Sequence, residues 1–381
     1  MNLTPNLARC PAYTLAILAT WWANVFSALA LEVTATDFVQ RTIYHSPQKP
    51  GYTSWCTLWR APNGHLRLAF QQVTGPVEKP EARTNLTVIL DSPDDATTWK
   101  VLREVPPRKN LSTSANGIYT SPGESGFCGH GLAALPDGTL VTGLWAGGGI
   151  DTGYIQHSSD DGQTWSPPIF FLDPRKYKTW PTILRLLHDG RLVLVAGVWE
   201  RQPGRPANPA IVKAMFTSAD GGRTWSPPTW LMTARQGVCE ESDFAELDNG
   251  DLLFVHRTEH FDGDKYLNSD RWQSIVRPHG REWVSGEPAK APFPHSGFPE
   301  LLKTREGLVL HVATDGIWWT ADAAVHWERL PLSGSPYYPR AMELPDDRIL
   351  IVGHVGSDDV YGTVDQSIRQ QTFRLKVTRH N

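Results

Sequence analysis

The chain has 381 residues, and its 36 Lys and Arg side chains nearly balance 40 Asp and Glu side chains, for a formal net charge of −4. A near-neutral chain without a basic stripe lacks the electrostatic footprint of a nucleic-acid-binding protein, so we expect no nucleic-acid partner. The 32 Gly and 30 Pro residues indicate many turns. Long helical periodicity is hard to find, and the pattern therefore favours an all-β protein.

The N-terminus differs from the rest of the chain. Residues 12–30 are apolar and uncharged, follow Arg9 and end in an Ala-Leu-Ala triplet. This pattern is typical of a secretory signal peptide with an A-x-A cleavage site, and a membrane anchor is the alternative. The small residues at the cleavage position favour the signal peptide. We therefore expect residues 1–30 to be removed, and residues 31–381 to form a secreted or periplasmic protein without a membrane span.

Three cysteines would remain in that mature chain, namely Cys56, Cys128 and Cys239. An odd number permits at most one internal disulfide and leaves one thiol over. No CxxC or His/Cys spacing indicates zinc, so we expect neither a metal ion nor another cofactor.

Six segments along the chain share one pattern, which is an apolar run, a tight turn and a second apolar run. They are residues 56–70, 131–145, 182–197, 243–257, 299–313 and 340–354. Five of the turns contain a glycine, and Asp347 takes this place in the sixth. Turns of this kind between apolar runs predict β-hairpins.

A second set of turns lies between these hairpins and ends in tryptophan. The strings "SSDDGQTW" (158–165) and "SADGGRTW" (218–225) are nearly identical, and "SPDDATTW" (92–99) and "TADAAVHW" (320–327) are altered copies. Each unit thus contains two hairpins, or four strands. Six units predict a six-bladed β-propeller of four-stranded antiparallel blades, because radial closure protects the sheet edges.

The two intact strings match the Asp box, S-x-D-x-G-x-T-W, and a propeller with such boxes resembles the sialidase (neuraminidase) superfamily with its BNR repeats. The resemblance covers essentially the whole mature chain, and we expect residues 31–45 and 367–377 to share a blade that closes the ring. It implies that the boxes join third and fourth strands, with Asp160 and Asp220 in structural roles on the face opposite the active site. We expect a monomer.

The opposite face is where each inner strand begins and where the following strand ends, and propeller ligands usually bind there. Counting back from the turns gives one residue per blade at the start of the inner strand: Trp55, Gly129, Pro181, Glu241, Phe298 and Tyr338. A glutamate and a tyrosine that converge on this face are unusual for a packed core.

The resemblance also implies catalytic roles. Sialidases use a tyrosine nucleophile activated by a glutamate, because a carboxylate nucleophile would be repelled by the carboxylate of the substrate. Glu241 and Arg257 fall on the places of the base and of an anion-binding arginine, and Tyr338 falls on the place of the nucleophile. Tyr337 is one residue away and should therefore point to the other side of its strand.

The sequence departs from the sialidase pattern in its arginines. Sialidases hold the substrate carboxylate with three arginines, because guanidinium groups bind carboxylates bidentately. Here Trp55 stands in the place of the first arginine, and the fifth blade offers none. Arg340, two residues beyond Tyr338 on the same side of the strand, is the available substitute for a substrate contact.

The acid/base and one polar rim residue complete the prediction. The loop of residues 71–85 has no aspartate, and of its carboxylates we prefer Glu81 over Glu78 as the acid/base. His130 lies between two glycines on the rim, where it either binds a sugar hydroxyl or caps a loop.

We therefore expect a secreted exo-glycosidase of the sialidase superfamily that removes a terminal sugar, sialic acid foremost, from a glycan or glycoconjugate substrate. One alternative is an enzyme of the same scaffold for another acidic or a neutral glycan. The other is a non-catalytic glycan-binding propeller. The incomplete arginine set supports both alternatives.

Overall fold

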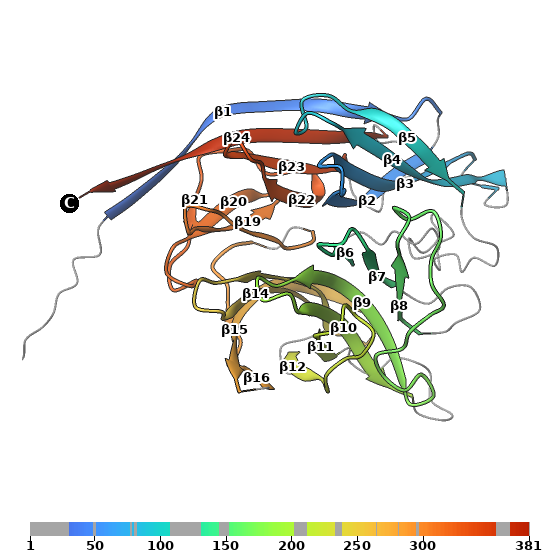
Figure 1. The fold of residues 1–381 in the computed structure, drawn as a ribbon. Helices are drawn as coiled ribbons and strands as arrows, with labels where there is room; N and C mark the ends of the chain where they lie inside the picture. Colours follow the sequence, from blue (N-terminus) through green and yellow to red (C-terminus); the bar gives the residue numbers. More distant parts are fainter. Residues whose placement is uncertain are drawn as a thin grey trace, which may run out of the picture. The chain divides into compact units, whose positions relative to one another are not determined.

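The computed structural model describes residues 30–48, 51–76, 78–79, 82–106, 131–144, 152–201, 212–232, 238–263, 265–280, 282–294, 297–355 and 366–380. The elements that these residues form are all β-strands, in six antiparallel sheets (Figure 1). Within this described part of the chain, no helix is long and apolar enough to span a membrane. The predicted signal peptide, residues 1–30, lies almost wholly outside it and stays a prediction.

Each sheet is one blade, and the strand named first for each blade is its innermost strand. Blade 1 consists of β2 (Gly51–Arg60), β3 (Leu66–Thr74), β4 (Thr84–Ser92) and β5 (Lys100–Val105). Blade 2 consists of β6 (Leu132–Ala134), β7 (Leu140–Leu144) and β8 (Tyr154–Ser158). Blade 3 consists of β9 (Tyr177–Leu186), β10 (Leu192–Glu200), β11 (Val212–Ser218) and β12 (Thr229–Met232). Blade 2 thus shows three strands in the described residues, and a bridge between Ile155 and Ile169 takes the place of the fourth.

Blades 4 to 6 follow in the same order. Blade 4 consists of β13 (Val238–Glu246), β14 (Leu252–Asp262), β15 (Lys265–His279) and β16 (Glu282–Ser285), with β17 (Ala289–Lys290) paired to β15. Blade 5 consists of β18 (Glu300–Lys303), β19 (Val309–Ala313), β20 (Gly316–Thr320) and β21 (Glu328–Arg329). Blade 6 consists of β22 (Tyr337–Glu343), β23 (Arg348–His354), β24 (Ser367–His380) and β1 (Ala30–His45). The predicted six-bladed propeller is confirmed, and so is the sharing of one blade by both ends of the chain.

The inner strands close the ring. The first strands of consecutive blades contact one another from β2 through β22, and β22 contacts β2 again. Blades pack face to face, so the inner strands are buried on both sides; nine of the ten residues of β2 are buried. This is why the sequence shows nearly continuous apolar runs in these strands rather than strict alternation.

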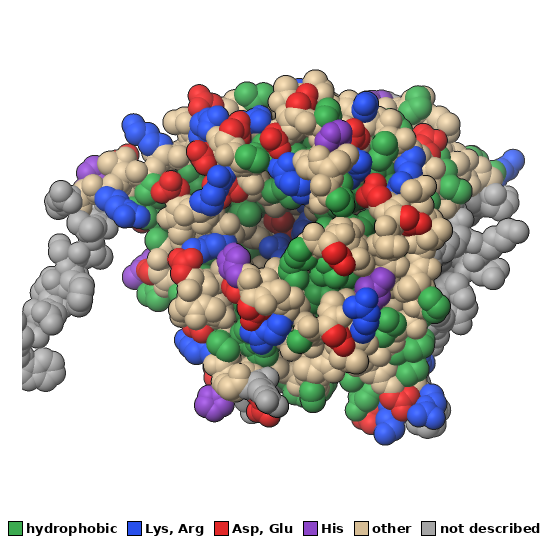
Figure 2. Space-filling model, viewed as in Figure 1, with side chains coloured by type: hydrophobic (Ala, Val, Ile, Leu, Met, Phe, Trp, Pro, Cys, Tyr) green, Lys and Arg blue, Asp and Glu red, His purple; other side chains and the backbone are tan. Residues whose placement is uncertain are grey.

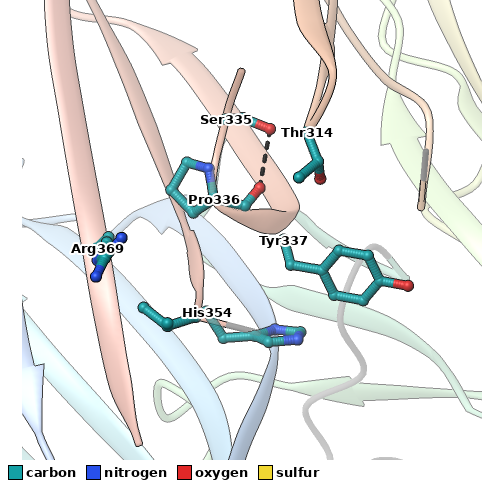
Figure 3. Close-up of a pocket in the computed structure, with 7 residues that line it drawn as sticks. Thr314, Ser335, Pro336, Tyr337, His354 and Arg369 are labelled. Carbon is teal, nitrogen blue, oxygen red and sulfur yellow. Dashed lines mark hydrogen bonds between the residues drawn. The ribbon is translucent and has the colours of Figure 1, made fainter. Parts of the chain in front are cut away.

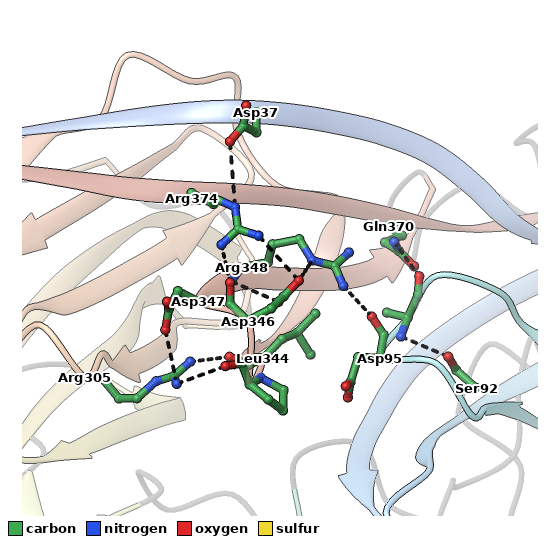
Figure 4. Close-up of polar contacts among 12 residues, drawn as sticks. Asp37, Ser92, Asp95, Arg305, Leu344, Asp346, Asp347, Arg348, Gln370 and Arg374 are labelled. Atoms are coloured by element: carbon green, nitrogen blue, oxygen red, sulfur yellow. Dashed lines mark hydrogen bonds and ion pairs between the residues drawn. The ribbon is translucent and has the colours of Figure 1, made fainter.

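The turn of blade 6 is held from both neighbouring blades (Figure 4). Arg348 donates to the Asp346 carboxylate at 2.7 Å and to the Asp95 carbonyl of blade 1 at 3.0 Å. From blade 5, Arg305 reaches the Asp347 carboxylate at 3.2 Å and donates to the Leu344 carbonyl. These contacts join the blade made from the chain ends to both of its neighbours.

The propeller proper is the unit Val33–Val377, and a small second unit contains Met1–Glu32 and Thr378–Asn381. Within the described part of the small unit, His380 Nε2 lies 3.1 Å from Glu32 Oε2. All residues considered below belong to the propeller unit.

The tryptophan-terminated turns use their aspartates internally. After β8, Ser158 Oγ accepts a hydrogen bond from Gly162 N at 2.8 Å, and Asp160 Oδ1 accepts one from Thr164 N at 2.8 Å. The hydroxyl of Thr164 also donates to Asp160, and these bonds hold the pKa of this carboxyl well below its usual range. Asp220 makes the corresponding bonds after β11. Both carboxylates therefore support their own turns, in the structural role that we expected.

Candidate active site

Two of the inner strands, β2 and β22, contain a bulge near the end at which they begin. The β2–β3 register shifts between Ser54 and Thr57, and the β22–β23 register shifts between Tyr337 and Arg340. Within these bulges Trp55 has φ 50° and Tyr338 has φ 48°. A positive φ is costly for an aromatic residue, so the surrounding fold must stabilise it. The bulges re-aim single side chains at this face of the ring.

The predicted nucleophile and base meet here, although they are 97 residues apart in the chain. The Tyr338 hydroxyl donates a hydrogen bond to Glu241 Oε1. Arg257 Nη1 donates to Glu241 Oε2 at 2.8 Å and lies 3.4 Å from the Tyr338 oxygen. Tyr338 is 8% exposed and Glu241 9%, so the contact is nearly dry. Blades 4 and 6 thus bring together three of the six residues predicted for the site.

The second terminal nitrogen of Arg257 is also engaged. It donates to Glu259 Oε1, and Glu259 is buried on the same strand, β14. Burial opposes the charge of Arg257, but the neighbouring Glu241, Tyr338 and Glu259 outweigh burial and raise the pKa of Arg257. Two carboxylates therefore flank one guanidinium. The sequence analysis missed Glu259, although its position two residues beyond Arg257 on a strand places both on one side.

Arg271 is a further buried cation beside this group. It is the Cα partner of Arg257 in the β14–β15 register and is 2% exposed. Its Nη2 donates to the Gly297 carbonyl. Burial lowers the pKa of Arg271 to about 10, although Glu241 acts in the opposite direction. The hairpin patterns considered above did not extend to the third strand of a blade, so they gave no signal for Arg271.

Aromatic rings surround the tyrosine. Trp55 and Phe298 belong to the same buried cluster as Tyr338. The ring of His354 stacks on Tyr338 with centroids 5.9 Å apart and an interplanar angle of 22°. Burial lowers the pKa of His354 to about 3, so this imidazole is neutral at physiological pH.

Tyr337 was predicted to point to the other side of its strand, but its ring contacts that of Tyr338, with centroids 4.9 Å apart, because the bulge at Tyr338 interrupts the regular alternation of side chains. It lines a cavity of about 380 Å³ between blades 5 and 6, together with Thr314, Ser335, Pro336, His354, Val355 and Arg369. In Figure 3 the rings of Tyr337 and His354 extend toward the same side of this cavity. A Cβ at Gly297, which has φ 58°, would lie 3.0 Å from the Tyr337 ring, so this position favours glycine.

Arg340 is engaged in a buried ion pair. Its Nη1 lies 2.6 Å from Glu300 Oε2, and its side chain is 10% exposed. Arg185 joins the same network, 2.5 Å from Asp243 and 3.5 Å from Glu300. The four residues come from the inner strands of blades 3 to 6. The guanidinium of Arg340 is therefore committed to a protein carboxylate, and we do not include it in the substrate contacts proposed below.

Two predicted site residues, Glu81 and His130, lie outside the described residues, as does Cys128. The side chains of Cys56 and Cys239 are buried. In the described ranges, no cluster of three or more His, Cys, Asp or Glu side chains has a geometry for holding a metal ion. Figure 2 shows one face of the molecule, hollowed near its middle, where acidic and basic side chains gather.

Comparison with known proteins gives structural likenesses. No protein-family model and no curated protein matches the sequence. Among solved structures, an α-L-arabinanase of Penicillium chrysogenum, complexed with arabinobiose, is 15% identical with a TM-score of 0.60 over 89% of this chain and 98% of its own. A protein of unknown function from Dyadobacter fermentans is 17% identical with a TM-score of 0.61, over 90% and 99%.

Trypanosoma rangeli sialidase, in complex with the inhibitor DANA, is 14% identical with a TM-score of 0.51. The alignment covers 89% of this chain and 60% of the sialidase chain. At these identities the likenesses establish the fold. The fold itself is shared by proteins that are named for different sugars, so the chemistry has to be argued from the site.

Proposed function

We propose that this protein is a glycoside hydrolase in which Tyr338 is the nucleophile and Glu241 is its base. The hydrogen bond from the Tyr338 hydroxyl to Glu241 Oε1 carries the proposal. A phenol is a weak nucleophile until a base takes its proton, and Glu241 is placed to do so without rearrangement. The naming of structural neighbours as an arabinanase and a sialidase supports a sugar substrate.

Residues of this chain supply each proton transfer that the proposed hydrolysis requires. As Glu241 takes the proton, the Tyr338 oxygen bonds to the anomeric carbon of the sugar, and the bond from that carbon to the leaving oxygen breaks. An acid must protonate the leaving oxygen, and we assign this role to Glu81. Glu81, now a carboxylate, takes a proton from water as the water oxygen bonds to the anomeric carbon, the tyrosyl–sugar bond breaks, and Glu241 returns its proton to the Tyr338 oxygen. Arg257, hydrogen-bonded to Glu241 at 2.8 Å, stabilises the negative charge in both halves of the reaction.

Sialic acid is the first substrate to test, but one observation favours a second class, sugars without a carboxylate. Both terminal nitrogens of Arg257 are bound to Glu241 and Glu259, which leaves a poor fork for a substrate carboxylate. Arg340 is bound to Glu300. A neutral sugar, whose hydroxyls can bond these carboxylates, matches this arrangement better.

The test is release of a fluorescent phenol from aryl α-sialoside, aryl glucuronide and a set of neutral aryl glycosides that includes the arabinofuranoside. We expect turnover of at least one of them by the wild type and none above background by Tyr338→Phe. The glycoside that is turned over identifies the substrate class. No turnover of any, together with saturable binding of a glycan, would place this protein with the non-catalytic binders.

A further inference from the structure

The hairpin between β14 and β15 extends beyond the site and ends in apolar side chains. Phe261 is 43% exposed, Tyr266 50% and Leu267 54%. Single exposed apolar residues are ordinary, but three large ones at one hairpin tip are typical of an interaction surface. The neighbouring Asp262 and Lys265 are exposed and charged, so the tip also offers polar groups beside the rings.

The strand register connects this tip to the reaction centre. Arg257, Glu259 and Phe261 alternate along β14, which places them on one side of this strand, and the β14–β15 register shifts between His260 and Phe261, where it passes over Leu267. Phe261 is the Cα partner of Tyr266, which places both rings on that side. Phe261 is four positions beyond Arg257, or about 13 Å along a strand. This is more than one sugar ring and within the reach of a short oligosaccharide.

The rings are held in place rather than left loose. Their centroids are 5.9 Å apart at an interplanar angle of 75°. The Tyr266 hydroxyl is 2.7 Å from Ser269 Oγ, which fixes the orientation of its ring. The stem of the hairpin is braced by Asp270, whose Oδ2 lies 3.1 Å from both His260 Nε2 and Lys290 Nζ. A platform that is ordered before binding loses less entropy when a ligand arrives.

We propose that Phe261 and Tyr266 form a subsite for a sugar ring of the same glycan, distant from the bond that Tyr338 attacks. A sugar ring presents an apolar C–H face, and a flat aromatic ring is the complementary surface. The occupant is thus a longer oligosaccharide or polysaccharide chain, which lies along the row from Arg257 to the hairpin tip. This inference rests on the proposed function for its geometry, but binding tests it separately.

Binding is measured by titration calorimetry with the Tyr338→Phe variant, which cannot turn the ligand over. The probes are arabinobiose and arabinohexaose, and sialyllactose and a longer sialylated glycan. Adding Phe261→Ala and Tyr266→Ala is expected to weaken binding of the longer member of the bound series about tenfold and to change the shorter member less than twofold. Trp230→Ala, which removes a side chain 48% exposed on β12, is the matched control and is expected to change neither.

Two further variants separate stacking from simple apolar contact. Phe261→Tyr keeps a flat ring and is expected to keep the affinity for the longer glycan. Phe261→Leu keeps apolar area without a flat ring and is expected to lose it. Equal affinities of both variants would contradict a stacking subsite.

Kinetics distinguish failure of this inference from failure of the proposed function. With an aryl monosaccharide, kcat/KM of the alanine variants should equal that of the wild type. Equal losses for short and long ligands would mean that the hairpin only supports the site, and no loss for either would leave it without a role in binding. Either of these two results overturns the subsite. A dimer that dissociates on Phe261→Ala also overturns it, and so does a lack of binding of every probe. Absence of turnover by the wild type, with length-dependent binding intact, overturns the hydrolase and keeps the subsite.

Discussion

At the scale of single residues, the candidate site consists of one tyrosine from blade 6 beside carboxylates and guanidiniums from blade 4. Tyr338 is held at φ 48° in a bulge, and its hydroxyl bonds Glu241. Strain of this kind persists only where the surrounding fold supports it, and it is concentrated at functional sites. Arg257 links Glu241 to Glu259, so the charge balance of the site depends on these three side chains.

The first prediction concerns Tyr338→Phe. This change removes the oxygen that we propose as the nucleophile and leaves the Glu241–Arg257 ion pair, so kcat on the active aryl glycoside is expected to fall roughly a thousandfold or more. Tyr337→Phe is the control, because that ring faces the neighbouring cavity, and its kcat should stay within about threefold of the wild type. A small effect of Tyr338→Phe would contradict a tyrosine nucleophile.

The second prediction concerns Glu259→Gln. The change removes one negative charge and loosens the hold on the second terminal nitrogen of Arg257. An acidic sugar should gain more than a neutral one, so the ratio of kcat/KM for acidic over neutral aryl glycosides is expected to rise about tenfold, or 1.4 kcal/mol. Glu282→Gln, an exposed change on β16, should leave the ratio unaltered. A falling ratio would show that Glu259 assists anion binding instead.

At the scale of elements, the tryptophan-terminated turns keep their backbone conformation while their sequences change. Gly162 and Gly222 have positive φ in the two intact strings, and Ala96 and Ala324 adopt it in the altered ones, at 64° and 69°. The tryptophan side chains then bind the preceding blade: Trp99 Nε1 donates to Gln370 at 2.7 Å, and Trp327 Nε1 donates to Gln273 at 2.8 Å. These contacts stabilise the turn against the cost of a left-handed alanine.

The third prediction tests this cost at Ala323, which is exposed and has φ 56°. A left-handed alanine costs about 1 kcal/mol, which glycine relieves. The greater freedom of glycine in the unfolded chain offsets part of the gain, so Ala323→Gly is expected to raise the free energy of unfolding by about 0.5 kcal/mol. Ala321→Gly, in the same turn without a positive φ, should lower it. Urea unfolding of both variants checks the sign, and a lower stability for Ala323→Gly would show that the turn is not strained there.

At the scale of the whole molecule, the repeat pattern predicted the ring, its closure by both chain ends and the meeting of Glu241, Arg257 and Tyr338. These follow from periodic turns and from strand alternation, which are local in sequence. The pairing of Arg340 with Glu300 could not be predicted, because it depends on which side chains of the inner strands of different blades reach one another. Glu259 was within reach of the alternation rule, whereas Arg271 lies on a strand outside the hairpin patterns that located the site.

The last prediction concerns the buried ion-pair network of Arg185, Asp243, Glu300 and Arg340. Burial raises the pKa of Asp243 to about 7, against the attraction of Arg185 and with the support of the neighbouring Glu300. The unfolded value is about 3.9. Between these two values the folded protein holds a proton that the unfolded chain has released, so this group lowers the free energy of unfolding as pH rises from about 4 to about 7. The stabilising contribution is complete below the unfolded pKa and is lost as pH rises through the folded pKa.

Buried histidines act in the opposite direction. Burial lowers the pKa of His256 and of His354 to about 3, so each contributes stability that increases as pH rises toward 6.5. The wild-type slope alone therefore does not report Asp243, whereas the difference between wild type and Asp243→Asn does. Asp243→Asn is expected to be less stable throughout, because an amide cannot accept all the hydrogen bonds from Arg185, Phe244 and Leu301.

The loss caused by Asp243→Asn should be largest near pH 4.5 and should shrink by a few kcal/mol toward pH 7.5. Urea unfolding at intervals of half a pH unit measures it, with Asp248→Asn, at a carboxylate 87% exposed, as the control of constant effect. A loss that grows with pH would mean that Asp243 is ionised throughout this range. The buried network of Arg185, Asp243, Glu300 and Arg340 would then consist of full ion pairs, and its stabilising contribution would be lost as pH falls rather than as pH rises.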